Sequence, residues 1–417
     1  MKRDRAQSLP PAPPIGSLTM PMKRTRRLSQ AAFLTLTLVG VFIVGGNAER
    51  WCPFGGVEAI YAYATDGTML CSLGVTNLYV LGALLVMTII LRRAFCGYVC
   101  PVGTISDWLQ VGARRCGVKP KRVPPAVDRA LSFLKYVLLG VILLITWRAS
   151  ELLFRGFDPC YALLSRHGED ITIWAYVSAG AIVVASLFIA IPFCRWLCPL
   201  AAVMHPFSRF GITRIRRDED ACIACRKCST ACPMNIPVDK LGEVNSARCL
   251  SCMQCIDACP PRTGGALEWG PSKRLASRSW PRWILVAGVL LTLGAAVFAS
   301  YAWPLPSFVK ARAVASAAED EQPFAIVDLQ IHELTCRGRG TLLWYFLDRD
   351  DEFAVSGPLR LEAWPGDEPA RVRVHYDPAL AHPDAIQAAI VMPYFDMVGS
   401  RWRTSPFRIV GYEPFDL

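Results

Sequence analysis

Eight cysteines fall into two runs with the same spacing. The runs are Cys222-x2-Cys225-x2-Cys228-x3-Cys232-Pro233 and Cys249-x2-Cys252-x2-Cys255-x3-Cys259-Pro260. Thiolates spaced in this way ligate [4Fe-4S] clusters, and in two-cluster domains the fourth Cys of a run, just before proline, ligates the other cluster. The spacing therefore predicts one cluster on Cys222, Cys225, Cys228 and Cys259, and a second on Cys249, Cys252, Cys255 and Cys232.

Two other cysteine-rich arrangements fit the spacing less well. A zinc site uses four ligands in paired Cys-x2-Cys units and needs neither a third Cys at the same spacing nor a Cys-Pro. A disulfide framework is disfavoured in a reducing compartment. Two clusters in one small domain lie close enough for electrons to hop between them, which predicts a relay without a substrate pocket of its own.

Two further cysteine pairs share a second spacing. They are Cys96-x3-Cys100-Pro101 and Cys194-x3-Cys198-Pro199, and each lies where an apolar stretch ends. Spacing i, i+4 predicts that both thiols of a pair lie on one face of a helix, and a pseudo-twofold repeat would bring all four thiolates together. The alternative is that these are small apolar residues buried at helix ends. We favour a redox or metal site, whose ligand the sequence leaves open.

These motifs lie in a chain with the composition of a membrane protein. Of its 417 residues 53% are hydrophobic, and the mean hydropathy is +0.31, which exceeds the usual composition of soluble proteins. Five stretches approach or exceed the roughly 20 apolar residues that a spanning helix needs. They are residues 31–46, 75–91, 131–147, 171–193 and 283–303. For the first and shortest stretch, which follows a basic leader, a secretory signal peptide is the alternative.

The distribution of Lys and Arg predicts the orientation. Basic residues outnumber acidic ones seven to one in 1–29, nine to two in 92–135 and fourteen to seven in 195–282, whereas acidic residues outnumber basic ones after residue 303. Because basic residues are retained in the cytoplasm, we expect a multi-pass protein of the inner (cytoplasmic) membrane. The cysteine runs would lie in the cytoplasm and the C-terminal region in the periplasm or outside the cell. The net charge of +11 then reflects topology, and nucleic-acid binding is not expected.

Three more cysteines fall in segments expected on the outer side. Cys52 and Cys71 flank the first outer segment, and Cys160 lies in the second. On an oxidising face Cys52 and Cys71 could form a disulfide, or they could act with Cys160 as a redox or metal site. The residues themselves do not decide between these two interpretations.

A separate domain is expected after a linker at 304–322. Its elements are predicted at 323–334 (strand), 339–348 (helix), 359–364 and 371–376 (hairpin), 384–392 (helix) and 407–412 (strand). This order is the split βαββαβ arrangement of ferredoxin-like domains. The segment around Leu334-Thr335-Cys336 resembles the metal loop of heavy-metal-associated domains, but Arg339 stands in place of the second cysteine. A lone Cys336, assisted by His332, is a candidate metal or redox residue, and a docking module is the alternative.

The order of the motifs resembles a known family. Cys-Gly-Tyr-Val-Cys-Pro, Cys-Arg-Trp-Leu-Cys-Pro and the tandem cysteine runs are similar to those of membrane polyferredoxins related to the quinol dehydrogenase subunit of periplasmic nitrate reductase and to the nitrous-oxide reductase regulator. The resemblance covers roughly residues 30–275. It implies electron transfer between the quinone pool, cytoplasmic clusters and a redox partner, with the Cys-x3-Cys-Pro pairs essential to the path. Copper-reducing assembly proteins of cytochrome oxidase share these pairs.

The sequence thus predicts an α-helical membrane protein with five spans, an inserted two-[4Fe-4S] domain and a C-terminal α+β domain. The expected units are residues 1–29 (basic leader), 30–210 (four-helix membrane domain), 211–275 (cluster domain), 280–303 (fifth span), 304–322 (linker) and 323–417 (outer domain). The favoured function is electron transfer between the quinone pool or a cytoplasmic donor and a redox partner outside or in the cytoplasm, with quinone and copper as further candidate cofactors. The alternative is a copper or thiol reductase, or a metal-site assembly factor, at the outer face. No catalytic residue is recognisable, so whether the chain is the quinol-oxidising or metal-reducing part of an oxidoreductase stays open.

Overall fold

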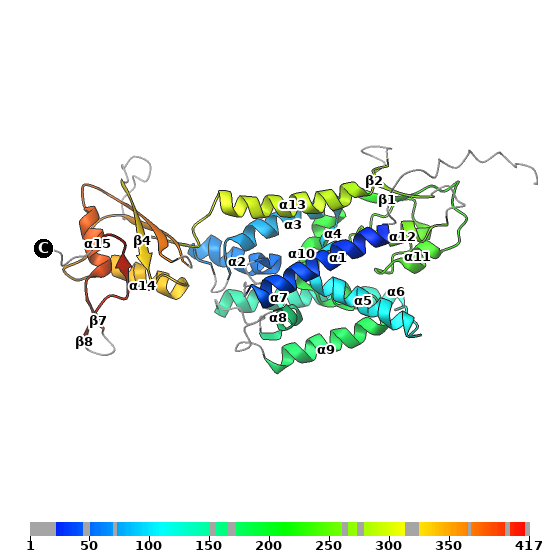
Figure 1. Cartoon of the computed structure of the whole chain (residues 1–417), viewed down its shortest axis with the longest axis horizontal. Helices are drawn as coiled ribbons and strands as arrows, with labels where there is room; N and C mark the ends of the chain where they lie inside the picture. The colour runs from blue at the N-terminus through cyan, green and yellow to red at the C-terminus, as the bar shows by residue number, and fades with distance from the viewer. Residues whose placement is uncertain are drawn as a thin grey trace, which may run out of the picture.

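The computed structural model of the chain describes residues 22–44, 51–69, 73–149, 156–164, 172–260, 266–272, 279–312, 325–365, 368–396 and 401–412. The described part is elongated. Apolar helices form its middle, the two cysteine runs lie at one end, and a domain built on a sheet lies at the other (Figure 1). Among the candidate functional cysteines, Cys71 lies outside the described residues.

Five apolar helices run along the middle of the molecule. They are α1 (Met22–Leu38, continued by the π-helical turn η1, Val39–Ile43), α3 (Thr76–Leu91), α7 (Leu134–Ala149), α9 (Ile173–Phe188) and α13 (Trp283–Ala302). Three described segments are long and apolar enough to cross a membrane: Lys23–Ile43, Pro125–Arg148 and Trp283–Ala302. The 16-residue helices α3 and α9 are only about 24 Å long, less than the roughly 30 Å of a bilayer core. The structure therefore supports three spans in its described part, and five are not established.

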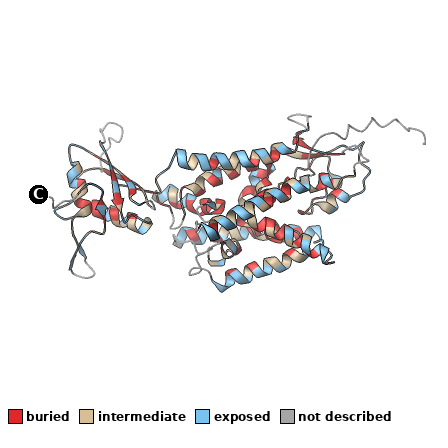
Figure 2. Cartoon of the chain, viewed as in Figure 1, coloured by how far each residue is buried: buried red, intermediate tan, exposed pale blue. Residues whose placement is uncertain are grey.

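The bundle exposes apolar side chains on its outside. Helix α13 buries Leu285 and Val289 against its neighbours, whereas Leu291 and Phe298 are exposed. Figure 2 shows exposed residues along the outer faces of α13, α1 and α9. A large apolar surface of this kind is expected where a helix bundle contacts lipid rather than water.

Several shorter helices begin at a proline next to a cysteine. They are α2 (Pro53–Asp66), α5 (Pro101–Arg115), α8 (Pro159–Leu164) and α10 (Pro199–Arg209). Proline suits the first helical position because its fixed φ is helical and its missing N–H would have no partner there. Two short turns, α4 (Ala94–Tyr98) and η4 (Phe193–Leu197), precede α5 and α10, and α6 (Pro125–Leu131) precedes α7. These four Cys-Pro and Pro-Cys dipeptides therefore mark helix starts, whereas Cys232-Pro233 follows the end of a helix, α11.

The end with the cysteine runs has little regular structure. Strands β1 (Thr213–Arg217) and β2 (Leu267–Pro271) pair antiparallel, with Ile215 opposite Trp269. Between them lie α11 (Lys227–Ala231), the 3₁₀ turn η5 (Val238–Lys240) and α12 (Gln254–Asp257). The two-stranded ribbon thus closes the domain, and the cysteine loops between its strands fold around their own side chains.

The C-terminal domain has a five-stranded antiparallel sheet. Its elements are β4 (Ala325–His332), α14 (Arg337–Leu347), β5 (Leu359–Trp364), β6 (Ala370–Tyr376), α15 (Pro383–Val391) and β9 (Arg408–Ile409), with a small hairpin of β7 (Tyr394–Asp396) and β8 (Arg401–Arg403). The strand order is β3-β5-β6-β4-β9. Without β3 and the β7–β8 hairpin, the chain order is the βαββαβ order that the sequence predicts.

One strand lies in the segment that the sequence assigns to a linker. β3 (Phe308–Arg312) pairs with β5 at the edge of the sheet. Phe308 is buried in the core of the C-terminal domain. The prediction of a linker over 304–322 is therefore wrong at these residues. A single buried side chain in a segment rich in Ala, Ser and charge gives no alternation that could reveal a strand.

Strand β3 also contacts the end of α2. The amide of Val309 donates to the carbonyl of Gly67 (2.7 Å), and the amide of Met69 donates to the carbonyl of Ser307 (2.8 Å). The Tyr63 hydroxyl donates to the carbonyl of Pro306 (3.1 Å). Helix α2 therefore links the helix bundle to the sheet of the C-terminal domain.

Replacing Gly67 by valine should loosen this contact. Gly67 has φ +65°, and a Cβ there would lie 2.5 Å from the carbonyl oxygen of Val309. Because the left-handed conformation alone costs an L-residue about 1–2 kcal/mol, we expect hydrogen exchange at the Met69 and Val309 amides to rise about tenfold. Gly117→Val is the matched control, since Gly117 has φ +86° but no atom near its Cβ position. Equal exchange in both variants would contradict the prediction.

Candidate functional site

The two cysteine loops, residues 222–228 and 249–255, have the same backbone conformation. Ala224 (φ 53°) and Ser251 (φ 50°) occupy equivalent positions, as do Arg226 and Met253, both at φ 59°. Non-glycine residues rarely adopt positive φ, and such residues cluster at functional sites. The same unusual turn in both loops shows that the repeat seen in the cysteine spacing is also a repeat of structure.

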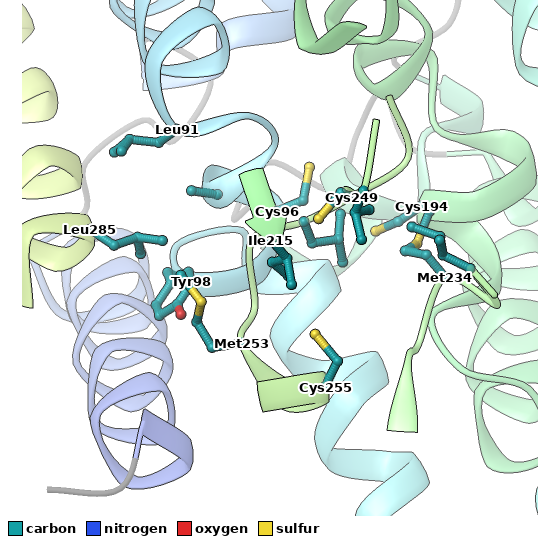
Figure 3. Close-up of a cluster of buried hydrophobic side chains, with 14 of the residues drawn as sticks. Leu91, Cys96, Tyr98, Cys194, Ile215, Met234, Cys249, Met253, Cys255 and Leu285 are labelled. Atoms are coloured by element: carbon teal, nitrogen blue, oxygen red, sulfur yellow. The ribbon is translucent and has the colours of Figure 1, made fainter. Parts of the chain in front are cut away.

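Four cysteines line one cavity, which we call the four-thiol cavity. Cys249, Cys252 and Cys255 come from the second loop, and Cys232 comes from the first run. About 330 Å³ of space free of protein atoms, part of it open to solvent, lies among the lining residues, and the rest of the wall is apolar, including Ile215 and Met234. The four thiols lie close enough to interact electrostatically. Cys249, Cys255, Ile215 and Met234 are labelled in Figure 3.

The chemistry of this cavity fits an iron-sulfur cluster. All its potential ligands are soft sulfur atoms, and its wall contains no carboxylate or imidazole. Burial raises the pKa of Cys232 to about 12, and a metal ion binds such a residue as the deprotonated thiolate. In the described part of the chain, no three Cys, His, Asp or Glu side chains converge on a single ion. A cubane does not need such convergence, since each thiolate binds a different iron atom.

The other four run cysteines differ in exposure. Cys225 is exposed, Cys222 and Cys259 are half-buried, and Cys228 is buried. The backbone N–H of Ala224 and then the side chain of Arg217 lower the pKa of the Cys222 thiol. This predicted ligand set therefore contains Cys225, the most exposed of the eight run cysteines, whereas the other set contains the buried Cys249 and Cys255.

The Cys-x3-Cys-Pro pairs are placed differently from the prediction of one helix face. Cys96 lies in α4 and Cys194 in η4, but Cys100 and Cys198 are the N-cap residues of α5 and α10, with extended ψ values of 119° and 115°. The expectation that each pair shares one helix is wrong, because proline at the following position starts a new helix. The two copies have the same geometry.

The two pairs nevertheless meet. Cys194 interacts electrostatically with Cys96, Cys100 and Cys198, so the four thiols form one group, which we call the thiol-pair site. Cys96 and Cys194 belong to the same hydrophobic core as Cys249 and Cys255. Figure 3 shows Cys96, Cys194 and Cys249 gathered near Ile215. The thiol-pair site and the four-thiol cavity are therefore neighbours.

The first thiol pair, Cys96 and Cys100, packs directly on the second cysteine loop. A Cβ on Gly97 would lie 3.3 Å from the carbonyl oxygen of Leu250 and 3.7 Å from Cβ of Cys252. The hydroxyl of Tyr98 donates to the carbonyl of Ser251 (3.3 Å). Glycine between these two cysteines therefore permits a close approach of two backbone segments.

Residues of helix α1 also bind Gly97, the glycine that contacts the second cysteine loop. Arg26 Nε and Gln30 Nε2 both donate to the carbonyl of Gly97, at 3.0 and 3.1 Å, and Arg26 pairs with Asp107 at 3.2 Å. The sequence places Arg26 in a basic leader at 1–29, but helix α1 begins at Met22. Arg26 is a buried part of the site, which net charge alone could not reveal.

Asp128 connects the second thiol pair, Cys194 and Cys198, to the second cysteine loop. One carboxylate oxygen accepts from Arg195 Nη2 (2.5 Å) and Trp196 Nε1 (2.8 Å), and the other accepts from Arg248 Nη2 (2.6 Å). Arg195 and Trp196 lie between the two cysteines of the pair, and Arg248 precedes Cys249. Sequence reasoning missed Asp128. The available signal was that Asp107 and Asp128 are the two acidic residues in the basic segment 92–135, and both bind arginines of the site.

The outer-segment cysteines lie beside the thiol-pair site. Cys52 is the N-cap of α2 and Cys160 lies in the first turn of α8. Cys160 interacts electrostatically with Cys52, Cys100 and Cys198. Both are free thiols in this structure. A disulfide from Cys52 to Cys71 stays a prediction, because Cys71 lies outside the described residues.

The C-terminal candidates do not come together. Cys336 is exposed at the N-cap of α14. The Nδ1 atom of His332 lies 2.6 Å from a carboxylate oxygen of Glu368, so its nearest partner is an acid and not the thiol.

Comparison with known proteins agrees with this geometry. A family model described as a 4Fe-4S binding domain matches residues 73–119 and 171–217, the two segments that carry the thiol pairs. A model described as a 4Fe-4S dicluster domain matches residues 214–260, which contain both cysteine runs. No solved structure matches the chain.

Curated relatives resemble the chain over part of its length. The putative electron transport protein YccM of Escherichia coli (strain K12) is 31% identical over 48% of this chain and 58% of its own length. The ferredoxin-type protein NapH of Haemophilus influenzae is 28% identical over 50% of this chain and 73% of its own length. The protein NirI of Paracoccus denitrificans is 31% identical over 37% of this chain and 23% of its own length. The chain thus spans less than two thirds of YccM and NirI.

Proposed function

Because the chain belongs with the membrane polyferredoxins related to NapH and NosR, we propose that it passes electrons between the quinone pool or a cytoplasmic donor and a redox partner through two [4Fe-4S] clusters. An iron-sulfur electron-transfer role in a membrane protein follows from the relatives and the apolar helices. The number of clusters, the quinone and the partner are our proposal.

The four-thiol cavity is the observation that carries this proposal. It brings Cys232 of the first run together with Cys249, Cys252 and Cys255 of the second, which is the exchange of fourth ligands expected of a two-cluster domain. We assign the solvent-facing cluster to Cys222, Cys225, Cys228 and Cys259. Each cluster, when bound, supplies a site that accepts and releases one electron.

The protein residues set the order of the path. Cys222 and Cys225 lie nearest to water, where a soluble donor can approach. The four-thiol cavity is buried and touches the first thiol pair through Gly97. An electron would thus move from the solvent-facing cysteines to the buried set and then to the thiol pairs inside the helix bundle. The reverse direction uses the same contacts.

The same arrangement supports the predicted sidedness. The cysteine runs and the C-terminal domain lie at opposite ends of the bundle (Figure 1), and the 20-residue helix α13 leads from one to the other. With the Lys and Arg distribution, we place the cysteine runs in the cytoplasm and the C-terminal domain outside the inner membrane.

The alternative, a copper or thiol reductase at the outer face, has one specific observation in its favour. Cys52 and Cys160 lie within electrostatic reach of Cys100 and Cys198, so electrons at the thiol pairs could reach thiols expected on the outer side. Under this alternative Cys52 or Cys160 is needed for all activity. Electron transfer through the clusters does not need them.

Transfer across a membrane tests the proposal. The full chain is placed in liposomes that contain trapped ferricyanide, and dithionite is added outside as the electron source. We expect ferricyanide reduction well above that of protein-free liposomes. Gly97→Leu should slow it severalfold, because a leucine would push Leu250 and Cys252 away and the rate of electron transfer falls as the distance between two centres grows.

Gly180→Leu is the matched control. Gly180 lies exposed in α9, and no atom lies within 4 Å of its Cβ position, so this variant should transfer electrons at the wild-type rate. A wild-type rate no greater than that of empty liposomes would overturn the proposal. An unchanged rate in Gly97→Leu would overturn the path through the first thiol pair.

A further inference from the structure

Two buried cations lie beside the thiol-pair site. The side chain of Arg93 is 0% exposed, and that of Lys135 is 2% exposed. Arg93 Nη2 donates to the carbonyl of Cys194 (3.3 Å), and both cations interact electrostatically with Cys198. The two cations, reached from α4 and α7, thus converge on one group of sulfur atoms.

Among the described residues neither cation forms a salt bridge with an Asp or Glu. In the described part of the chain, Arg93 Nε and Nη1 have no hydrogen-bond partner. Asp128 is engaged by Arg195 and Arg248. A buried guanidinium without a counter-charge costs several kcal/mol. Neutral thiols would leave the charge of Arg93 uncompensated, whereas four metal-bound thiolates would place negative charge next to it.

Arg92, the residue before Arg93, is likewise a buried cation, and it lies beside the four-thiol cavity. Arg92 is 1% exposed, Nε and Nη2 have no protein partner among the described residues, and its side chain lies against the thiol of Cys249. Its Nη1 donates to the carbonyl of Ser246 (2.7 Å). Two consecutive arginines with unpartnered nitrogen atoms among the described residues therefore lie beside two neighbouring sets of four cysteines.

The backbone around the thiol pairs is also arranged for thiolates. The N–H groups of Val102 and Gly103 point at the sulfur of Cys100, and that of Ala201 points at the sulfur of Cys198. These are free N–H groups of the first turns of α5 and α10, where a helix favours negative charge. N–H groups directed at cluster sulfurs are one of the means by which proteins set reduction potentials.

From these contacts we propose that Cys96, Cys100, Cys194 and Cys198 hold a third [4Fe-4S] cluster inside the helix bundle, with Arg93 and Lys135 as its counter-charges. This rests on the proposed electron-transfer function and adds the next acceptor after the buried cluster. The step is a transfer of one electron: one cluster is oxidised as the other is reduced, and no bond or proton is exchanged. Cys52 and Cys160 lie beyond it toward the outer side.

Iron content separates three clusters from two. The full chain is purified without oxygen in detergent, and iron, acid-labile sulfide and copper are measured per chain. We expect about twelve iron atoms, four for each cluster. The variant Cys100→Ala with Cys198→Ala should retain about eight. Cys116→Ala, which removes an exposed thiol at the C-cap of α5, should equal the wild type.

If the variant Cys100→Ala with Cys198→Ala does not fold, the iron content of the wild type alone still decides between two and three clusters. About eight iron atoms in the wild type, with or without copper, overturns the third cluster and leaves the proposed function in place. Fewer than about eight overturns the proposed function as well.

A potentiometric titration tests the role of the arginines. Arg93→Gln should lower the reduction potential of the third cluster and leave the other two unchanged, because a positive charge stabilises the reduced state. Arg92→Gln should instead lower the potential of the buried ferredoxin-type cluster. If Arg93→Gln shifts the same centre as Arg92→Gln, or shifts none, Arg93 does not face a separate cluster.

Discussion

Replacing Cys232 by alanine should remove the buried ferredoxin-type cluster and leave the solvent-facing one in place. Cys232 belongs to the first run by sequence, but its side chain lines the cavity formed by Cys249, Cys252 and Cys255. Removing one of four thiolate ligands leaves an open iron site that readily loses the cluster. We expect a loss of about four iron atoms and four sulfides per chain.

The identity of the lost cluster is the sharper measurement. A water-soluble paramagnetic ion broadens the electron paramagnetic resonance signal of a cluster near the surface more than that of a buried one. In Cys232→Ala the remaining ferredoxin-type signal should be broadened, because Cys222 and Cys225 lie near solvent. In Cys259→Ala, the reciprocal variant, the remaining signal should be protected. The opposite pattern would show that each run binds its own cluster.

The cysteine spacing contains most of the information about these two ligand sets. A Cys-x2-Cys-x2-Cys loop is local, so its turn, with positive φ at Ala224 and Ser251, follows from residues within seven positions. Grouping Cys232 with the second run required only the known exchange of the residue before proline. The sequence could therefore predict the lining of the four-thiol cavity without any knowledge of the surrounding fold.

The contacts that join the cavity to the helix bundle could not be predicted in this way. Arg26 and Gly97 are separated by 71 positions, and Asp128 and Arg248 by 120. The residues around Arg26 in the sequence do not show whether its side chain is buried and donates a hydrogen bond to a carbonyl or is simply one of the positive charges that flank a membrane span. Strand β3 is a similar case, since its residues pair with residues of β5 that lie 47 to 55 positions further along the chain.

The arrangement of the thiol pairs could be predicted from the sequence only in part. Their repeat in the sequence predicted that Cys96, Cys100, Cys194 and Cys198 meet, and the structure brings them together. The prediction that both thiols of a pair lie on one face of a helix was wrong. Pro101 and Pro199 begin new helices, so the second cysteine of each pair is an N-cap residue. The repeat was informative because it concerned the fold as a whole, whereas the i, i+4 rule assumed a continuous helix.

Replacing Asp128 by alanine should cause the largest loss of stability at the site. The carboxylate is the shared partner of Arg195 and Arg248, and the side chain of Arg195 is 4% exposed. Removing one partner of a buried ion pair typically costs about 3–5 kcal/mol, because the remaining charge has no compensation. We expect a lower apparent melting temperature in detergent by several degrees, together with loss of the buried cluster on warming before that of the solvent-facing one.

Two variants separate the charge of Asp128 from its shape and from a general surface effect. Asp128→Asn keeps an oxygen that can accept from Trp196 but removes the charge that Arg195 and Arg248 share, so its melting temperature should fall between those of the wild type and Asp128→Ala. Asp220→Ala changes an exposed aspartate beside the first cysteine loop and should stay within about 0.5 kcal/mol of the wild type. If Asp128→Ala were no less stable than Asp220→Ala, the second thiol pair would not depend on this carboxylate for its position. Other contacts, among them those of Gly97, Tyr98 and Arg92, would then hold the second cysteine loop on the bundle.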